Sequence, residues 1–217
     1  FAYLIRHFVF RFITFMIILG MFLVVASFLV KSYARYNYRI VPVKEELPEF
    51  TLNGNKYSHF LDKNLYENAH FVYANISFKE LSKEWNKVSK FDFSGKDNRG
   101  HKIKHTLIRY LTSKGYNKDS VGVSKLTQKD IQAIENGFAN YLYTEKLNIY
   151  ASLYKIFWQF ERFKNGSNPS GYSIVQRFYY MEAGLEIFNS SPIIGIGTGD
   201  VKDAYAKHYE ETNSVLS

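Results

Sequence analysis

One long stretch without charge limits the folding of this chain more than any other feature. It covers Phe12 to Val30 and reads FITFMIILGMFLVVASFLV. A helix rises about 1.5 Å per residue, so these residues span about 28 Å, close to the roughly 30 Å thickness of bilayer hydrocarbon. A core helix is seldom apolar on every face for so long. A signal peptide has a shorter apolar region and a small-residue cleavage site, which VASFLVKSY does not supply. The sequence therefore predicts a transmembrane helix over Phe12–Val30.

Basic residues flank this helix on both sides. Before it stand Arg6, His7 and Arg11, and after it stand Lys31, Arg35 and Arg39. The positive-inside rule requires an asymmetry, so the flanking charges do not choose an orientation. Three tyrosines on the exit side suit an interfacial belt, namely Tyr33, Tyr36 and Tyr38.

The composition narrows the choice of partners. Lys and Arg outnumber Asp and Glu by 28 to 20, a formal charge of +8, which favours phosphates, acidic glycans, lipid headgroups or nucleic acid. The basic residues are scattered, so a solvated basic surface explains the same excess. The absence of cysteine excludes disulfides and thiolate metal sites. The chain opens on Phe1 without an initiator Met and stops at Ser217 in a polar stretch, so we expect a fragment of a longer protein.

Four regions follow from these signals. Residues 1–38 hold the transmembrane helix and its flanks. Residues 39–58 contain two prolines and an Asn-Gly and are predicted to be a linker. Residues 59–171 are predicted to form a helical insertion, and residues 172–217 a motif helix with a glycine-rich loop. The fold class is therefore mainly α.

Helical patterns fill the insertion from His59 onward, and no strand alternation persists beyond a few residues. Ser77 with Glu80, and Thr127 with Asp130, have the spacing of capping boxes. The predicted helices are one that carries Phe78, Leu81, Trp85 and Val88, one over Thr106–Lys114 ended by Gly115, one from Thr127 to Gly137, and one over Leu147–Phe163.

Ile174–Ser190 is the strongest predicted helix after the membrane segment. It follows a break at residues 165–171 and ends before Pro192. An apolar stripe that we expect to be buried comprises Ile174, Phe178, Met181, Leu185 and Phe188, and the opposite side carries Glu182 and Glu186. Arg177 lies at the margin of this stripe. A buried guanidinium must be paired or solvated, and its planar fork suits phosphate. An Arg that reaches solvent or pairs with a carboxylate is the alternative.

Other short motifs carry less information. The GIGTGD run at residues 195–200 resembles a nucleotide-binding loop, but no βαβ pattern surrounds it, so a helix-to-helix connection is the simpler interpretation. His101 and His105 are four residues apart without an evident third ligand, and we expect both to be exposed. Asn75 begins a glycosylation sequon, in which Ser77 is better explained as a helix cap.

Residues 176–200, QRFYYMEAGLEIFNSSPIIGIGTGD, resemble the periplasmic-loop motif of the bacterial O-antigen ligase and polymerase superfamily. The positions that match this motif are Arg177, Pro192, Gly195, Gly197 and Gly199. Where the family commonly has Trp, this chain has Tyr180 or Met181. Residues 83–115 are similar to a long loop insertion of one subgroup, so the resemblance covers most of Tyr73–Ser217.

The resemblance implies that the chain is a fragment of a polytopic membrane protein, a bacterial inner-membrane glycosyltransferase with residues after about Tyr36 in the periplasm. Such enzymes move a glycan from undecaprenyl diphosphate to a lipid, glycan or protein acceptor in the cell envelope, as in lipopolysaccharide ligation. They invert the anomeric centre and use no metal, cofactor or nucleic acid. Arg177 would bind the diphosphate as a catalytic residue, and Gly195, Gly197 and Gly199 would bind substrate.

The catalytic base of the family is usually a His in a His-Asn context. His208 precedes Tyr209 instead, so the role is not assigned to it, and we expect this His beyond Ser217. The alternative to an enzyme is a membrane-anchored, non-catalytic helical domain that binds anionic envelope polymers or a protein partner.

Overall fold

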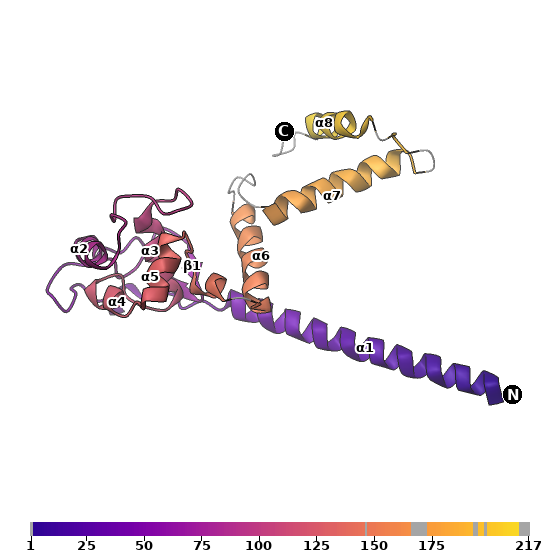
Figure 1. Ribbon diagram of the computed structural model, residues 1–217, viewed down its shortest axis with the longest axis horizontal. Coiled ribbons are helices and arrows are strands. Elements are labelled where there is room, and N and C mark those ends of the chain that lie inside the picture. Colours follow the sequence, from indigo (N-terminus) through magenta and orange to yellow (C-terminus); the bar gives the residue numbers. More distant parts are fainter. Residues whose placement is uncertain (1, 146, 166–172, 193–194, 198, 213–217) are drawn as a thin grey trace. The chain divides into compact units, whose positions relative to one another are not determined.

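The computed structural model describes residues 2–145, 147–165, 173–192, 195–197 and 199–212, with side chains from Phe8 onward. The chain is mainly helical, as predicted, and within these ranges the only sheet is a two-stranded hairpin (Figure 1). Contacts divide the chain after Ser152 into two units, which are described separately.

The bounds of the elements follow the chain order. Those wholly within the first unit are α1 (Ala2–Asn37), η1 (Lys44–Glu46), β1 (Tyr66–Glu67), β2 (His70–Phe71), α2 (Phe78–Val88), α3 (Ile103–Ser113), α4 (Ser120–Ser124), α5 (Gln128–Glu135) and η2 (Tyr141–Thr144). The remaining helices are α6 (Ile149–Lys164), which begins in the first unit, α7 (Ser173–Ser190) and α8 (Val201–Glu211).

The predicted apolar helix is confirmed and is longer than the apolar run itself. The most apolar 18-residue window within Phe8–Asn37 of α1 has a mean hydropathy of 2.8 and is not buried against the rest of the protein. Thr14 does not interrupt it, because its hydroxyl donates to the Phe10 carbonyl oxygen at 2.9 Å. α1 is therefore long and apolar enough to span a membrane.

The segment after α1 differs from the predicted free linker, because it docks on the helical part. Its backbone pairs with later residues through Ile40–His70 and Ser58–Ile76 bridges. Thr51 is buried, and its hydroxyl donates to the Glu80 carboxylate. Residues 40–58 thus belong to the first unit.

A hairpin occupies part of the region predicted to be helical from His59. Tyr66 pairs with Phe71 and Glu67 with His70 in antiparallel register. The two residues between the strands, Asn68 and Ala69, both have positive φ, as two-residue hairpin loops require. The first helix of the insertion therefore begins at Phe78.

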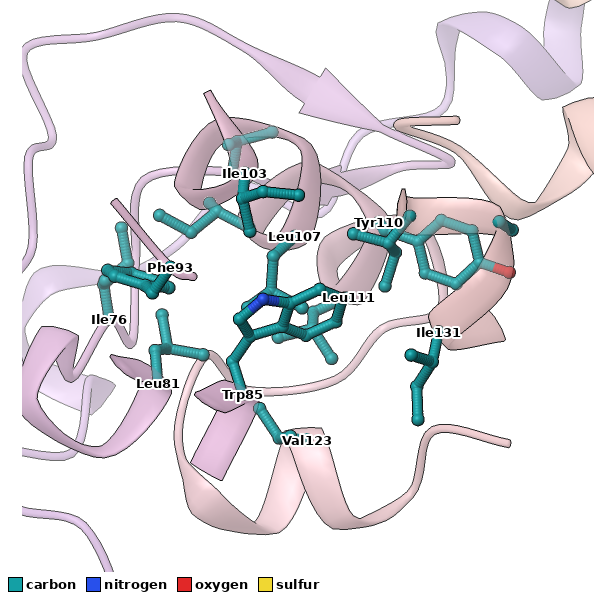
Figure 2. Close-up of a cluster of buried hydrophobic side chains, with 14 residues drawn as sticks. Ile76, Leu81, Trp85, Phe93, Ile103, Leu107, Tyr110, Leu111, Val123 and Ile131 are labelled. Atoms are coloured by element: carbon teal, nitrogen blue, oxygen red, sulfur yellow. The ribbon is translucent and has the colours of Figure 1, made fainter. Parts of the chain in front are cut away.

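An apolar core lies among α2, α3, α4 and α5 (Figure 2). Trp85 is its largest member and is fully buried, and its indole nitrogen donates to the Phe91 carbonyl at 2.8 Å. Of the predicted apolar positions on α2, Leu81 and Trp85 are buried while Phe78 and Val88 are exposed. α3 supplies the facing wall, with Ile103, Leu107 and Leu111 all fully buried.

Most of the predicted helix ends are confirmed. Thr127 and Asp130 form the expected reciprocal capping box on α5. Gly115 ends α3 with a φ of 72°; its N–H donates to Thr112 and that of Tyr116 donates to Leu111, which is a Schellman motif.

Two predicted starts are wrong and one predicted cap is absent. α3 begins at Ile103 instead of Thr106. The Ser77 side chain does not cap α2. The reciprocal bond of a capping box is also absent, because the Ser77 N–H donates to the Lys118 carbonyl at 2.8 Å and the Glu80 carboxylate accepts from other segments. Leu147 has a φ of 64° and cannot begin α6, which starts at Ile149 after Asn148 caps it by accepting from the Ala151 N–H at 2.9 Å.

Candidate functional site

Arg177, the residue singled out by the motif, lies in the first turns of α7 and is exposed. In the part of the chain that the structure describes, its guanidinium makes no ion pair or hydrogen bond. Arg177 thus reaches solvent, which is one form of the stated alternative, and it has no carboxylate partner among these residues. A cation in this state is available to an external anion.

The apolar stripe beside Arg177 is exposed, which corrects the expectation that it is buried. Phe178, Met181, Leu185 and Phe188 have exposed fractions of 49%, 56%, 56% and 58%. α7 instead buries Val175 and Ala183, and the half-exposed Phe178 makes an edge contact with Phe160 of α6, with ring centroids 5.1 Å apart. The helical phase had grouped the stripe correctly, but it does not say which face a neighbouring helix covers.

The glycines lie at the other end of α7 from Arg177. Thirteen residues separate Arg177 from Ser190, or about 20 Å at 1.5 Å per residue, so α7 does not bring the two parts of the motif together. Gly195 and Gly197 have φ of 70° and 75°, a conformation that favours glycine, whereas Gly199 does not have a positive φ. Ile193, Ile194 and Thr198 of the motif, and most of the predicted break at 165–171, lie outside the described residues.

The glycine run connects two helices, as the simpler interpretation held. It leads into α8, which the sequence pattern did not reveal because this segment is polar and rich in tyrosine. Tyr205 of α8 donates a hydrogen bond to the Tyr180 carbonyl oxygen at 3.0 Å. A Cβ at Gly184 would lie 2.5 Å from the Tyr205 hydroxyl, so any larger residue there would displace the Tyr205 side chain. The tyrosine spacing in residues 205–209 was the available signal.

Three aromatic rings form a cluster between α7 and α8. The ring of Tyr180 lies 6.5 Å from that of Tyr205 and 6.2 Å from that of Tyr209. The hydroxyl of Tyr209 is buried and has no hydrogen-bond partner among the described residues. Burial, followed by the nearby Tyr180 and Tyr205, raises its pKa. This hydroxyl therefore stays protonated at neutral pH.

The histidines occupy different surroundings. The His208 Nδ1 lies 3.7 Å from a Glu186 carboxylate oxygen. His101 and His105 are both exposed, as expected, and His101 lies 3.4 Å from Asp97. Within the described ranges no three His, Cys, Asp or Glu side chains are grouped so that they could hold a metal ion.

Comparison with known proteins found no relative of this chain. No protein-family model, curated protein or solved structure matches this chain.

Proposed function

We propose that this chain is part of a membrane-bound glycosyltransferase that moves a glycan from a lipid diphosphate carrier, undecaprenyl diphosphate, to an acceptor hydroxyl, as O-antigen ligases and polymerases do. The observation that carries the proposal is the state of Arg177. It is an exposed, unpaired guanidinium at the margin of an apolar face that the described chain leaves uncovered. A helix with an apolar face and a basic edge is typical of the membrane interface, where lipid phosphates lie.

The chemistry requires a cation at that place. In an inverting transfer the acceptor hydroxyl attacks the anomeric carbon, the bond from that carbon to the diphosphate oxygen breaks, and the hydroxyl proton passes to a base. Negative charge develops on the departing diphosphate. Arg177 would stabilise this charge with two parallel N–H donors. The resemblance of residues 176–200 to the periplasmic-loop motif supports the same role, in which Gly195 and Gly197 would let the backbone approach the substrate.

Transfer of glycan from purified carrier by the full-length enzyme tests the proposal. Arg177→Ala should lower the rate by about 30- to 1000-fold, because one charge-assisted contact to the transition state is lost. Arg177→Lys keeps the charge but not the fork and should lie between this variant and the wild type. Lys202→Ala, which removes an exposed cation from α8, is the matched control and should transfer normally.

Folding of each variant is checked by circular dichroism and by its elution volume in detergent. Near-normal transfer by a folded Arg177→Ala protein would contradict the proposal. A different outcome, no transfer by the folded full-length wild type, would favour the non-catalytic anchor that binds anionic envelope polymers.

A further inference from the structure

A cavity of about 570 Å³ lies in the first unit, where the end of α1 meets the hairpin, the end of α3, η2 and the first turn of α6. Its lining contains no Asp or Glu. It does contain two permanent cations, Arg35 and Lys114, together with His70 and the rings of Tyr38, Tyr141 and Tyr150. A concave, tyrosine-lined site with only basic charge suits an anion.

Arg35 provides the uncompensated charge of this cavity. Its Cζ lies 4.2 Å from the centroid of the Tyr150 ring, a cation–π contact that fixes the guanidinium while leaving its in-plane N–H groups free to donate. No carboxylate pairs with Arg35 in the described chain. Tyr150 therefore positions the fork without neutralising it.

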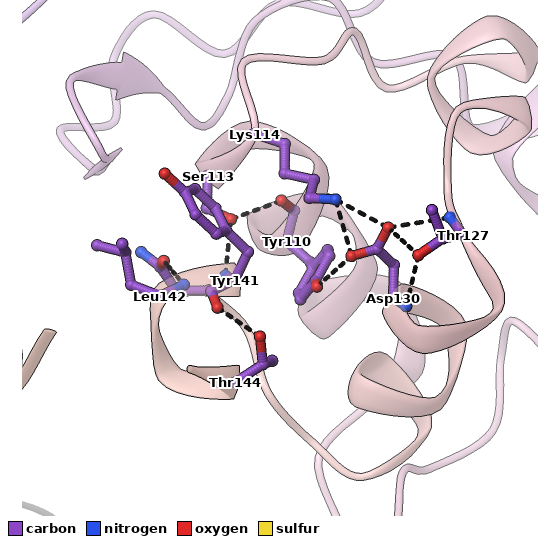
Figure 3. Close-up of polar contacts among 9 residues, drawn as sticks. Tyr110, Ser113, Lys114, Thr127, Asp130, Tyr141, Leu142 and Thr144 are labelled. Carbon is purple, nitrogen blue, oxygen red and sulfur yellow. Dashed lines mark hydrogen bonds and ion pairs between the residues drawn. The ribbon is translucent and has the colours of Figure 1, made fainter. Parts of the chain in front are cut away.

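The Lys114 side chain lines the cavity and is held in place by Asp130 (Figure 3). Its Nζ lies 2.8 Å from both carboxylate oxygens of Asp130, which also accepts from the Tyr110 hydroxyl at 2.6 Å. The neighbouring Ser113 hydroxyl donates to the Tyr110 carbonyl at 2.7 Å and accepts from the Tyr141 N–H at 3.1 Å. Three lining residues, Ser113, Lys114 and Tyr141, are thus held by bonds within the fold, which lowers the entropy lost on binding.

The position of the cavity relative to the bilayer indicates where its anion comes from. With the apolar part of α1 across a bilayer, Arg35 lies five residues beyond Val30, or about 7.5 Å past the hydrocarbon edge. The polar layer on each side of a bilayer is roughly 5–7 Å thick. The backbone of Arg35 therefore lies at the outer edge of the headgroup layer, and its long side chain can reach a lipid phosphate from there.

We propose that this cavity binds the phosphate of an anionic phospholipid headgroup, with Arg35 as its principal ligand. The bound lipid would tether the first unit to the bilayer surface beside α1. The lining of the cavity does not include Arg177, and this proposal does not rest on the transfer reaction proposed above.

Native mass spectrometry of the full chain in mild detergent tests this binding with two defined lipids. Phosphatidylglycerol should be retained about tenfold more strongly than zwitterionic phosphatidylcholine, and Arg35→Gln should abolish most of this preference. Arg35→Lys should keep part of it. Lys31→Gln, an equal loss of charge one turn earlier and outside the cavity, is the matched control and should retain the full preference.

Inorganic diphosphate distinguishes the other source of the same chemistry. It should not displace bound phosphatidylglycerol at equal concentration, because the lipid is also held by its acyl chains. Displacement would assign the cavity to a soluble phosphate and overturn the lipid proposal. Equal retention of the two lipids by the wild type, or equal retention of phosphatidylglycerol by wild type and folded Arg35→Gln, would also overturn it.

Discussion

At the scale of single residues, Glu80 joins parts of the first unit that are distant in sequence. Its side chain is buried and accepts hydrogen bonds from the Thr51 hydroxyl, from the Asn55 side chain at 2.7 Å and from the Ser120 N–H at 2.9 Å. Burial alone would raise the pKa of this carboxyl, but the hydrogen bonds outweigh burial and lower the pKa to about 2. The ionised carboxylate thus holds residues 40–58 and the start of α4 on α2.

Glu80→Gln should therefore destabilise the first unit by about 2–3 kcal/mol at pH 7, because donors lose a charged acceptor. The pKa in the folded state is below the ordinary value of 4.5, so this contribution is complete above about pH 4.5 and is lost as pH falls toward 2. Denaturant unfolding of the detergent-solubilised chain at several pH values measures it. Glu84→Gln, on the same helix and paired with Lys87 at the surface, should change stability little. A Glu80→Gln deficit that stays constant down to pH 2 would contradict this account.

At the scale of elements, local sequence signals predicted most helix ends, but they did not predict which helix faces are buried. The Thr127 cap and the Gly115 stop depend on residues within one turn, and the structure has both. The predicted cap at Ser77 failed because Glu80 has partners distant in sequence. The stripe containing Leu185 was grouped correctly by its period, yet it is exposed, because periodicity assigns residues to a face and does not identify what covers it.

The contact between Gly184 of α7 and Tyr205 of α8 gives a prediction for a double-mutant cycle. The effect of Gly184→Ala on the stability of α7 should change sign when Tyr205 is replaced by Phe. Ala is normally better than Gly within a helix by roughly 1 kcal/mol, but at Gly184 a Cβ would lie 2.5 Å from the Tyr205 hydroxyl oxygen and 3.6 Å from its Cζ. Gly184→Ala should therefore speed hydrogen exchange of α7 amides in the wild-type background. In the Tyr205→Phe background the clash is gone, and the same substitution should slow exchange. An identical effect in both backgrounds would exclude the contact.

At the scale of the whole molecule, the sequence predicted the character of individual segments, such as an apolar helix or a series of turns. It did not predict which segments contact one another. The uncharged run over Phe12–Val30 was sufficient to predict α1, because length and apolarity decide that question alone. The prolines and Asn-Gly of residues 40–58 indicated turns, and nothing local indicates that turns dock on α2. The cavity beside Arg35 was also missed, since its wall combines side chains from segments more than 100 residues apart, such as Arg35 and Tyr150.

The orientation of the chain in the membrane is the last prediction, and the natural absence of cysteine makes it directly testable. We expect everything after about Tyr36 to be extracytoplasmic, because the proposed transfer uses a donor on that side. Leu52 is 89% exposed, so Leu52→Cys places a thiol in solvent without removing a buried side chain. It should react with a membrane-impermeant maleimide in intact bacterial spheroplasts. Leu23→Cys, within the apolar span of α1, should remain unlabelled even after lysis, since a thiol in hydrocarbon is rarely ionised. Labelling of Leu52→Cys only after lysis would place the helical units in the cytoplasm and would exclude the proposed reaction.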